Sequence, residues 1–329
     1  MAALTLTALI WGLAFVAQVQ GMDAMSPMFF NAARFTLGAL SLVPILLWTK
    51  ARTRRNAGGR ADGTGADDGT STISESASSS SPGHSVSAPA KATRLRTLLT
   101  GCLCGVFLFT ASTLQQYGVL IGKSAGRAGF ITALYIVIVP LLGLVFLRRR
   151  INALTVVSVV LAVVGFYFLC VTDGFGSLGL GDVMLFGCAV LFAAHIVVID
   201  SLGAKVDALE LSFVQFCFTA LASWIGSAID GSIDFAGAMA GIVPVLYAGI
   251  GSVGIAYTLQ VVGQAYVPPT RAALIMSLES FFSVVGGALI LGETMTPRGY
   301  LGCALIFVGT LLAQTPAKLP KWMRRTETE

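Results

Sequence analysis

Three ionisable side chains inside long apolar runs are candidates for chemistry: Glu279, Arg34 and His195. An acid or an imidazole in an apolar setting is able to carry a proton, and a guanidinium is able to bind an anion. Each also has a structural interpretation. Glu279 would be hydrogen-bonded between helices, Arg34 would turn its charge to the surface or pair with a carboxylate, and His195 would be a packing residue.

Polar and aromatic side chains accompany these groups. Trp11, Phe15 and Gln18 have the spacing i, i+4, i+7 and share one face of a helix. An amide beside aromatic rings suits an organic substrate of mixed polarity, although helix packing accounts for the same pattern. The residues that we predict to bind substrate are Trp11, Gln18, Arg34, Gln116, Tyr135, His195, Tyr257, Gln260 and Glu279.

Sequence patterns of catalysis are absent. The sequence contains no H-E-x-x-H, no G-x-S-x-G and no G-x-x-x-x-G-K-[ST], so neither a zinc hydrolase, a serine hydrolase nor ATP hydrolysis is indicated. Cys102 and Cys104 are two residues apart, and on a helix they point away from each other. We therefore predict no catalytic residue, no cofactor and no metal site.

The composition indicates the class of protein that positions these residues. Of the 329 residues 55% are hydrophobic and 11% are charged, whereas a soluble domain has about 25% charged residues. This excludes a soluble enzyme, a disordered protein and a disulfide scaffold, and leaves a polytopic membrane protein. The net charge is +5, but the basic residues lie at the ends of apolar runs, which argues against a nucleic-acid partner.

Runs of about 20 mostly apolar residues, the length of a membrane-spanning helix, fill most of the sequence. Their short connections force neighbouring runs to be antiparallel. We predict an all-α integral membrane protein with ten transmembrane helices. The ten runs are 3–22, 27–48, 97–117, 126–147, 152–171, 182–201, 209–229, 241–263, 270–291 and 297–315.

Basic residues mark one side of the membrane. They cluster between the second and third runs, at 148–150 and after 316, and all three places lie on one side of a ten-helix protein. The positive-inside rule predicts that both termini are cytoplasmic, in a multi-pass protein of the cell (plasma) membrane. Residues 51–95 are polar and rich in Gly and Ser, so we predict a disordered cytoplasmic loop there.

The sequence repeats itself internally. An offset of 144 residues aligns Arg127 with Arg271 and Tyr135 with Glu279, and an offset of 181 aligns Phe35 with Phe216. Each copy has five spans, and an odd number inverts the second copy in the membrane. The predicted first repeat is 3–50 and 96–171, interrupted by the 51–95 loop; the second repeat is 182–315, and 316–329 is a cytoplasmic tail.

Four segments resemble one family. They are LIWGLAFVAQ (9–18), FFNAARFTLGAL (29–40), AGFITALYIVIVPLLGLVFLRRR (128–150) and LIMSLESFFSVVGGALILGETMT (274–296), and they are similar to EamA-type members of the drug/metabolite transporter superfamily. Ser280 stands where the family usually has proline after Leu-Glu. The resemblance implies two EamA-like repeats in a secondary-active transporter, an exporter of small organic metabolites or drugs that works by alternating access.

The implied partners are a small-molecule substrate and membrane lipids. Proton coupling through Glu279 is one interpretation, and the protein would be a monomer or a homodimer. Two other classes of function stay open from the residues. One is a passive channel or facilitator, and the other is an intramembrane enzyme, for which only His195 is available as a membrane histidine.

Overall fold

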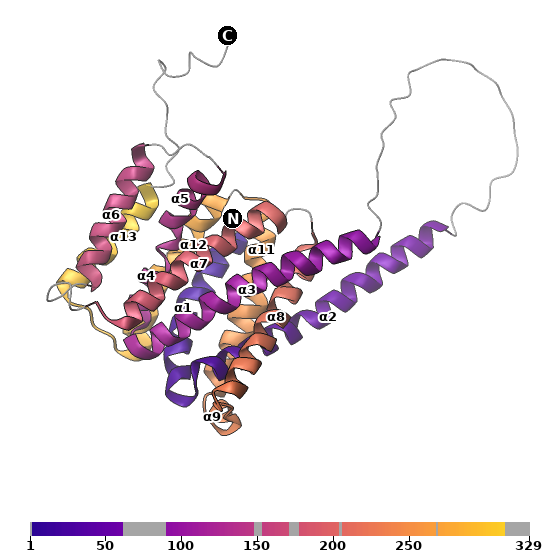
Figure 1. Ribbon diagram of the computed structural model, residues 1–329, viewed down its shortest axis with the longest axis horizontal. Helices are drawn as coiled ribbons and strands as arrows, with labels where there is room; N and C mark the ends of the chain where they lie inside the picture. Colours follow the sequence, from indigo (N-terminus) through magenta and orange to yellow (C-terminus); the bar gives the residue numbers. More distant parts are fainter. Residues whose placement is uncertain are drawn as a thin grey trace, which may run out of the picture.

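The computed structural model describes residues 2–61, 90–147, 153–170, 178–203, 206–267 and 269–312, which form helices and short connections and include no strand (Figure 1). The helices in the first half of the chain are α1 (Ala2–Ala24), α2 (Pro27–Ala61), α3 (Ala90–Gly122), α4 (Ala125–Thr132), α5 (Tyr135–Leu147) and α6 (Ala153–Cys170). Those in the second half are α7 (Leu180–Leu202), α8 (Ala208–Ile229), α9 (Phe235–Ala240), α10 (Ile242–Leu246), the π-helix η4 (Tyr247–Tyr257), α11 (Thr258–Gln264), α12 (Pro269–Leu291) and α13 (Pro297–Leu312).

Helix is present in each of the ten predicted runs, but not all helices have the length and composition of a span. Among the described residues, seven helical segments are long and apolar enough to cross a membrane. Two shorter apolar segments, Val156–Leu169 and Ile275–Leu291, lie in α6 and α12. The chain is therefore an all-helical, multi-pass membrane protein, and the count of ten spans stays a prediction.

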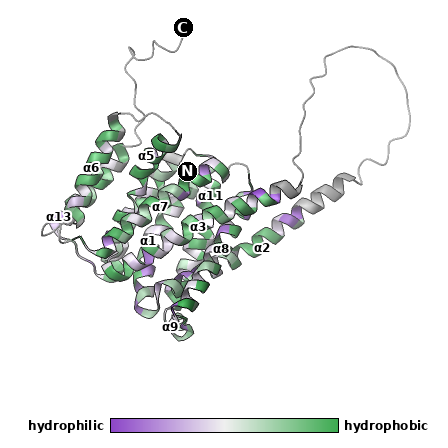
Figure 2. Ribbon diagram, viewed as in Figure 1, coloured by the Kyte–Doolittle hydropathy of each residue, from purple (hydrophilic) through white to green (hydrophobic). Residues whose placement is uncertain are grey.

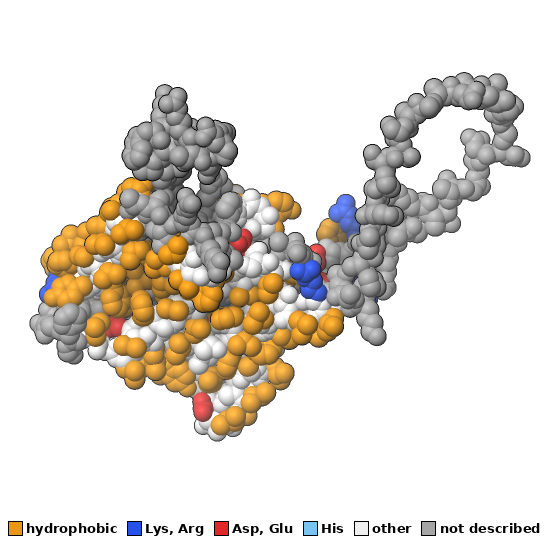
Figure 3. Space-filling model, turned by 45° about the horizontal axis from the view of Figure 1, so that its top comes forward, with side chains coloured by type: hydrophobic (Ala, Val, Ile, Leu, Met, Phe, Trp, Pro, Cys, Tyr) orange, Lys and Arg blue, Asp and Glu red, His pale blue; other side chains and the backbone are white. Residues whose placement is uncertain are grey.

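The distribution of side chains suits lipid as the surrounding solvent. Apolar residues cover the helices and the visible face of the bundle (Figures 2 and 3). Leu289 and Ile229 expose 81% and 80% of their surface, whereas Asn31, Gln116 and Gln215 are fully buried. Polar groups inside and apolar groups outside are expected where water does not reach the helix surfaces.

Two helices extend into the segment predicted as a disordered loop. α2 continues to Ala61 and α3 begins at Ala90, so helix occupies both ends of residues 51–95. Propagating an existing helix needs no new nucleus, and this favours continuation beyond the apolar part. The rest of that predicted loop, and the predicted tail 316–329, lie outside the described residues.

Two predicted spans are not continuous α-helices. The predicted span 126–147 is divided between α4 and α5, and i→i+3 bonds such as Leu134 N to Ile131 O (3.2 Å) tighten the chain between them. The predicted span 241–263 contains the π-helix η4, flanked by α10 and α11. Interruptions of this kind place backbone groups beside the core and are frequent at functional sites.

The helices pack in a regular pattern. α3 packs on α7 and α8, while η4 packs on α1 and α2. α1 also packs along α12, α2 along α8, and α4 along α12. α6 and α13 lie side by side at one edge of the bundle (Figure 1). The core therefore lies where α1, α2, α4, α7, η4 and α12 converge.

Candidate functional site

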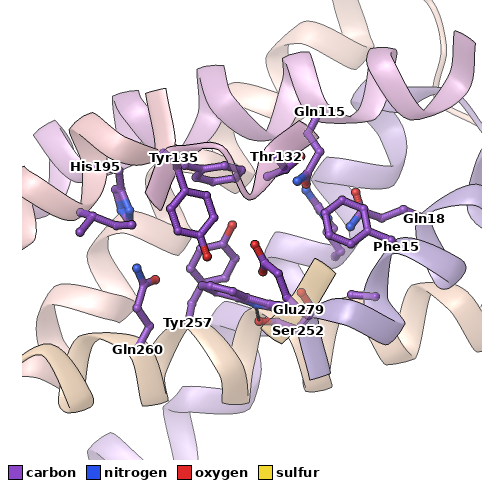
Figure 4. Close-up of a pocket in the computed structure, with 15 residues that line it drawn as sticks. Phe15, Gln18, Gln115, Thr132, Tyr135, His195, Ser252, Tyr257, Gln260 and Glu279 are labelled. Atoms are coloured by element: carbon purple, nitrogen blue, oxygen red, sulfur yellow. Dashed lines mark hydrogen bonds between the residues drawn. The ribbon is translucent and has the colours of Figure 1, made fainter. Parts of the chain in front are cut away.

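A small cavity lined by polar and aromatic side chains lies at this convergence (Figure 4). Its volume is about 30 Å³, enough for water-sized molecules but far below the roughly 300–1,000 Å³ of pockets for organic ligands. The structure therefore represents a nearly closed state of the site. The lining residues are Trp11, Ala14, Phe15, Gln18, Arg34, Gln115, Thr132, Tyr135, Phe192, His195, Ile196, Ser252, Tyr257, Gln260 and Glu279.

Every residue that the sequence predicted for substrate binding lines this cavity, except Gln116. The Gln116 amide instead donates from Nε2 to the sulfur of Met22 at 3.5 Å. Its neighbour Gln115 lines the cavity in its place. That these residues bind a substrate stays a prediction.

Tyr135 and Glu279, which the 144-residue offset relates, both line the cavity. Tyr135 is the first residue of α5, and Glu279 lies in the middle of α12 (Figure 4). Both are buried, and their side chains interact electrostatically. Neither the Tyr135 hydroxyl nor Glu279 Oε1 has a hydrogen bond of ordinary geometry to any described residue.

Other polar atoms of the lining share this property. Each is buried and has no hydrogen-bond partner among the described residues, although most buried polar atoms in proteins have one. Seven of the 18 such atoms among the described residues belong to the lining of this one cavity, and there they offer hydrogen-bonding groups to solvent or to a polar ligand. The atoms are Gln18 Oε1, Arg34 Nε, Arg34 Nη2, Thr132 Oγ1, Tyr135 Oη, Gln260 Oε1 and Glu279 Oε1.

His195 is held by the protein itself. Its Nε2 lies 2.9 Å from Gln215 Oε1, a buried amide of α8, and its ring lies edge-on to Tyr257 with centroids 6.5 Å apart. Because the amide oxygen accepts, Nε2 carries a proton in this arrangement. The hydrogen bond fixes the orientation of an imidazole that also borders the cavity.

Trp11 joins α1 to the π-helix. Its indole Nε1 donates to the carbonyl of Ser252 at 3.2 Å, and its ring meets Tyr257 with centroids 4.7 Å apart. One turn earlier, Thr7 Oγ1 donates to the carbonyl of Ala256 at 3.2 Å. The i→i+5 pattern of a π-helix disturbs the usual pairing of carbonyls, and α1 supplies side-chain donors to two of them.

Arg34 projects from α2 and is 2% exposed. Its guanidinium carbon lies 5.6 Å from the centre of the Phe30 ring and 5.0 Å from that of Phe35. Among the described residues it forms no ion pair. The predicted alternatives of an exposed or carboxylate-paired arginine are therefore wrong for this conformation, because the side chain is enclosed by aromatic rings instead.

A clamp of charged residues, Glu293 with α4 and Arg127 with Asp182, lies beyond one end of the cavity. Glu293 accepts from the Ser124 hydroxyl and from the backbone N–H of Ala125, at 2.9 and 2.6 Å. A carboxylate at these groups stabilises the N-terminus of α4. One turn into α4, Arg127 donates from Nε and Nη2 to the two oxygens of Asp182, at 2.8 and 2.6 Å.

Glycine makes this clamp possible. A Cβ on Gly287 would lie 2.8 Å from Glu293 Oε2, so the carboxylate occupies the space of a missing side chain. Gly292 has a φ of 67°, which turns the chain after α12 and brings Glu293 N within 3.0 Å of Gly287 O. The sequence singled out the Gly-Glu pair only as part of a family pattern, and its contact with α4 had no signal in the sequence.

Sequence reasoning also missed several lining residues. Gln115 was not predicted because its neighbour Gln116 is the residue that the repeat pairs with Gln260. Thr132 was not predicted because it lies within an apolar run. Phe192 and Ile196 are apolar residues of α7, and nothing in their type distinguishes them from packing residues. Phe15, noted for its helical face, lines the cavity together with Trp11 and Gln18.

The helices surround a central cavity lined by polar and aromatic side chains. The model of the EamA-like transporter family matches residues 1–61 and 179–315, and the chain belongs to this family. This confirms the resemblance to the drug/metabolite transporter superfamily. It also establishes the chain as a membrane transporter by family.

Two further proteins are similar to this chain over most of its length. A protein of Archaeoglobus fulgidus described as an uncharacterized transporter is 27% identical over 309 residues, which are 94% of this chain and 83% of that protein. A solved crystal structure superposes with a TM-score of 0.60 at 17% identity, covering 94% of this chain and 95% of the other. The second likeness concerns the fold alone.

Proposed function

We propose that the protein is a secondary-active carrier that moves small organic molecules across the cell membrane by alternating access. The cluster of buried, unpartnered polar atoms around one central cavity carries this proposal. An acid, a cation, amides and aromatic rings together suit an organic molecule of mixed polarity. Export as the direction rests on the family resemblance.

The proposed inverted repeat is supported by helix contacts that occur twice. A Cβ on Gly105 of α3 would lie 2.7 Å from the Cβ of Phe218 of α8. A Cβ on Gly249 of η4 would lie 2.7 Å from the Cβ of Leu37 of α2. The offset of 144 relates Gly105 to Gly249, and the offset of 181 relates Leu37 to Phe218. The repeat thus relates two contacts, each of which joins a glycine of one half to a side chain of the other half.

The pairing of α6 with α13 repeats in the same way. A Cβ on Gly165 would lie 2.7 Å from the carbonyl oxygen of Gly302. A Cβ on Gly309 would lie 2.9 Å from the carbonyl oxygen of Ser158. The offset of 144 exchanges these two contacts. A pseudo-twofold axis between the repeats accounts for both observations.

Alternating access follows from such a duplication. If 3–50 with 96–171 and 182–315 are inverted copies, each half can adopt the conformation of the other, and the cavity then opens to the opposite side. Ten spans, five in each copy, are part of this proposal. The small volume of the cavity fits a state between the two openings.

The proposed orientation places both termini in the cytoplasm. Lys50 and Arg52 on α2, and Arg94 and Arg96 on α3, lie on helix ends that project together beyond the bundle (Figure 1). A single cysteine at position 80, in a variant whose six native cysteines are replaced, tests it. We expect no reaction with an impermeant thiol reagent in intact cells and full reaction in broken cells; labelling from outside would reverse the topology.

Transport itself is tested with purified protein in liposomes. Vesicles preloaded with a metabolite mixture are given a pH gradient, and release is compared with protein-free vesicles and with vesicles containing a protonophore. A carrier is expected to saturate and to show exchange when the same compound is supplied outside. A non-saturable flux without exchange would favour the channel, and chemical change of a compound would favour the enzyme.

A further inference from the structure

Arg34 is a buried cation for which the described residues provide no counter-ion. It lies 2% exposed between two phenylalanine rings, and its Nε and Nη2 have no hydrogen-bond partner among the described residues. Removing a guanidinium from water costs several kcal/mol unless a partner compensates. The contacts with Phe30 and Phe35 recover only part of this. The side chain therefore has the properties of one half of an ion pair.

A second arginine, Arg127, shows which chemical group the guanidinium of Arg34 would bind. Arg127 uses the same two nitrogens, Nε and Nη2, to bind both oxygens of the Asp182 carboxylate at 2.8 and 2.6 Å. This edge of the guanidinium matches the geometry of a carboxylate and binds it with two parallel hydrogen bonds. In Arg34 the same edge is unpaired and buried next to the cavity.

The acid of the cavity does not fill this role. Glu279 also belongs to the lining, but among the described residues no ion pair joins it to Arg34. Glu279 lies close to Tyr135 instead, without a hydrogen bond of ordinary geometry between Glu279 Oε1 and the Tyr135 hydroxyl. The charge of Arg34 is thus left for a group that comes from outside the protein.

The other lining residues indicate the chemistry of the rest of the ligand that would bind Arg34. Trp11, Phe15, Phe192 and Tyr257 present aromatic rings to the same cavity, and these favour an aromatic or apolar body. We propose that the substrates are organic monocarboxylates, whose carboxylate binds the Nε–Nη2 edge of Arg34 while the body packs on these rings. This inference rests on the proposed role of the cavity as the transport site.

Matched pairs of acids and amides test the proposal on the purified full-length protein in detergent. The probes are benzoate with benzamide and phenylacetate with phenylacetamide, which have similar shapes but differ in charge. Binding is measured by intrinsic tryptophan fluorescence and by the midpoint of thermal unfolding. We expect each acid to bind at least tenfold more tightly than its amide. Equal binding within a pair, or no binding of either acid, overturns the proposal.

Variants locate the effect at Arg34. In Arg34→Gln the preference for acid over amide is expected to disappear, and in Arg34→Lys it is expected to weaken, because lysine keeps the charge but lacks the planar edge. Arg298→Gln is the matched control, since Arg298 also lies over two rings, those of Tyr167 and Phe168, but does not line the cavity. A preference that survives in Arg34→Gln overturns the proposal.

Two further variants distinguish ligand binding by Arg34 from a structural role. Arg34→Met replaces the charge by an apolar chain, and we expect its unfolding midpoint without ligand to equal or exceed that of the wild type. A large loss of stability in this variant would mean that Arg34 has a structural partner, and would contradict the proposal. In Glu279→Gln we expect the acids to bind more tightly, because a negative charge that repels a bound carboxylate is removed from the lining; weaker binding of the acids would contradict the proposal.

The vesicle assay separates this proposal from the proposed function. Acids that bind through Arg34 but are never exchanged across the vesicle membrane would leave the carboxylate site standing and refute the carrier. Exchange of neutral or cationic compounds by a protein that does not bind the acids would leave the carrier standing and refute the carboxylate site.

Discussion

The repeat-related regions α4–α5 and α12 differ in backbone conformation and in the hydrogen bonding of their polar side chains. An offset of 144 residues relates them, but α4–α5 is interrupted before Tyr135, whereas α12 passes through Glu279 as a continuous helix. In α12, Ser280 and Ser283 donate to carbonyls one turn back, both at 2.8 Å. α12 therefore satisfies its serine hydroxyls within the helix and leaves Glu279 Oε1 without a hydrogen-bond partner among the described residues, whereas α4–α5 leaves Thr132 and Tyr135 unsatisfied at the cavity.

The difference indicates a division of roles. A continuous helix holds an acid at a fixed depth, and an interrupted helix is able to hinge where its hydrogen bonds change partner. The clamp at Glu293 joins the two, because the end of α12 caps the start of α4. The two regions thereby share a defined contact.

The largest expected effect concerns the acid. In Glu279→Gln we expect pH-driven transport in liposomes to fall to background, because glutamine keeps the shape and hydrogen bonding but does not titrate. Substrate binding, measured by thermal shift, is expected to persist. A variant that transports normally and still responds to pH would end the proton-carrier role and leave Glu279 as a packing residue.

The matched variant Glu279→Ala tests the structural interpretation. If the carboxyl holds helices together, alanine should lower the free energy of unfolding by about 1–3 kcal/mol, because it leaves buried partners unpaired. If the carboxyl serves transport alone, the loss should be smaller than this. Thermal unfolding of the two variants side by side distinguishes the cases.

The clamp between the two regions is tested by Gly287→Ala. The added methyl group would lie 2.8 Å from Glu293 Oε2, so the carboxylate must shift, and the weakened cap should cost about 0.5–1 kcal/mol of unfolding free energy relative to a helical Gly→Ala change without such a contact. Gly122→Ala serves as control, since a Cβ there meets no atom within 4 Å. Equal stability of the two variants in thermal unfolding would contradict the role of the clamp.

A smaller effect is expected from the tyrosine. The hydroxyl of Tyr135 has no hydrogen-bond partner among the described residues, so Tyr135→Phe should change stability by less than about 0.5 kcal/mol. If the hydroxyl contacts substrate, the apparent affinity in the vesicle assay should fall several-fold. A large loss of stability instead would assign the hydroxyl to the packing of α5.

The smallest effect is expected between α2 and α3. Residues 62–89 have no counterpart in the second half of the sequence, so their deletion, with a short Gly-Ser linker between Ala61 and Ala90, should leave transport unchanged. The measurement is the initial rate in vesicles at matched protein content. A lower rate at equal membrane abundance would assign this segment a function.

The positions of most lining residues were predictable because helical spacing fixes a face. Trp11 and Gln18 were placed by i, i+7 spacing on α1, and Tyr135 and Glu279 by the internal repeat. Such arguments need only a regular helix. The all-helical, membrane-embedded class followed from composition in the same direct way.

The failure at Gln116 has a physical cause. The offset of 144 pairs Gln116 with Gln260, but the helix that corresponds to α3 contains η4, whose wider turns shift the register of the residues that follow. Gln260 therefore faces the cavity together with Gln115 and not with Gln116. A π-helix leaves no clear trace in composition, so the sequence could not reveal this shift, nor the interruption before Tyr135.

The volume of the cavity has a thermodynamic consequence. At about 30 Å³ the site excludes any organic molecule, so a substrate binds only the fraction of molecules whose site has widened. The measured dissociation constant is then the intrinsic constant divided by that fraction. Substitutions outside the lining that favour the widened state would raise apparent affinity for every substrate by one common factor. Ranking substrates by ratios of affinity, and not by absolute values, cancels this factor.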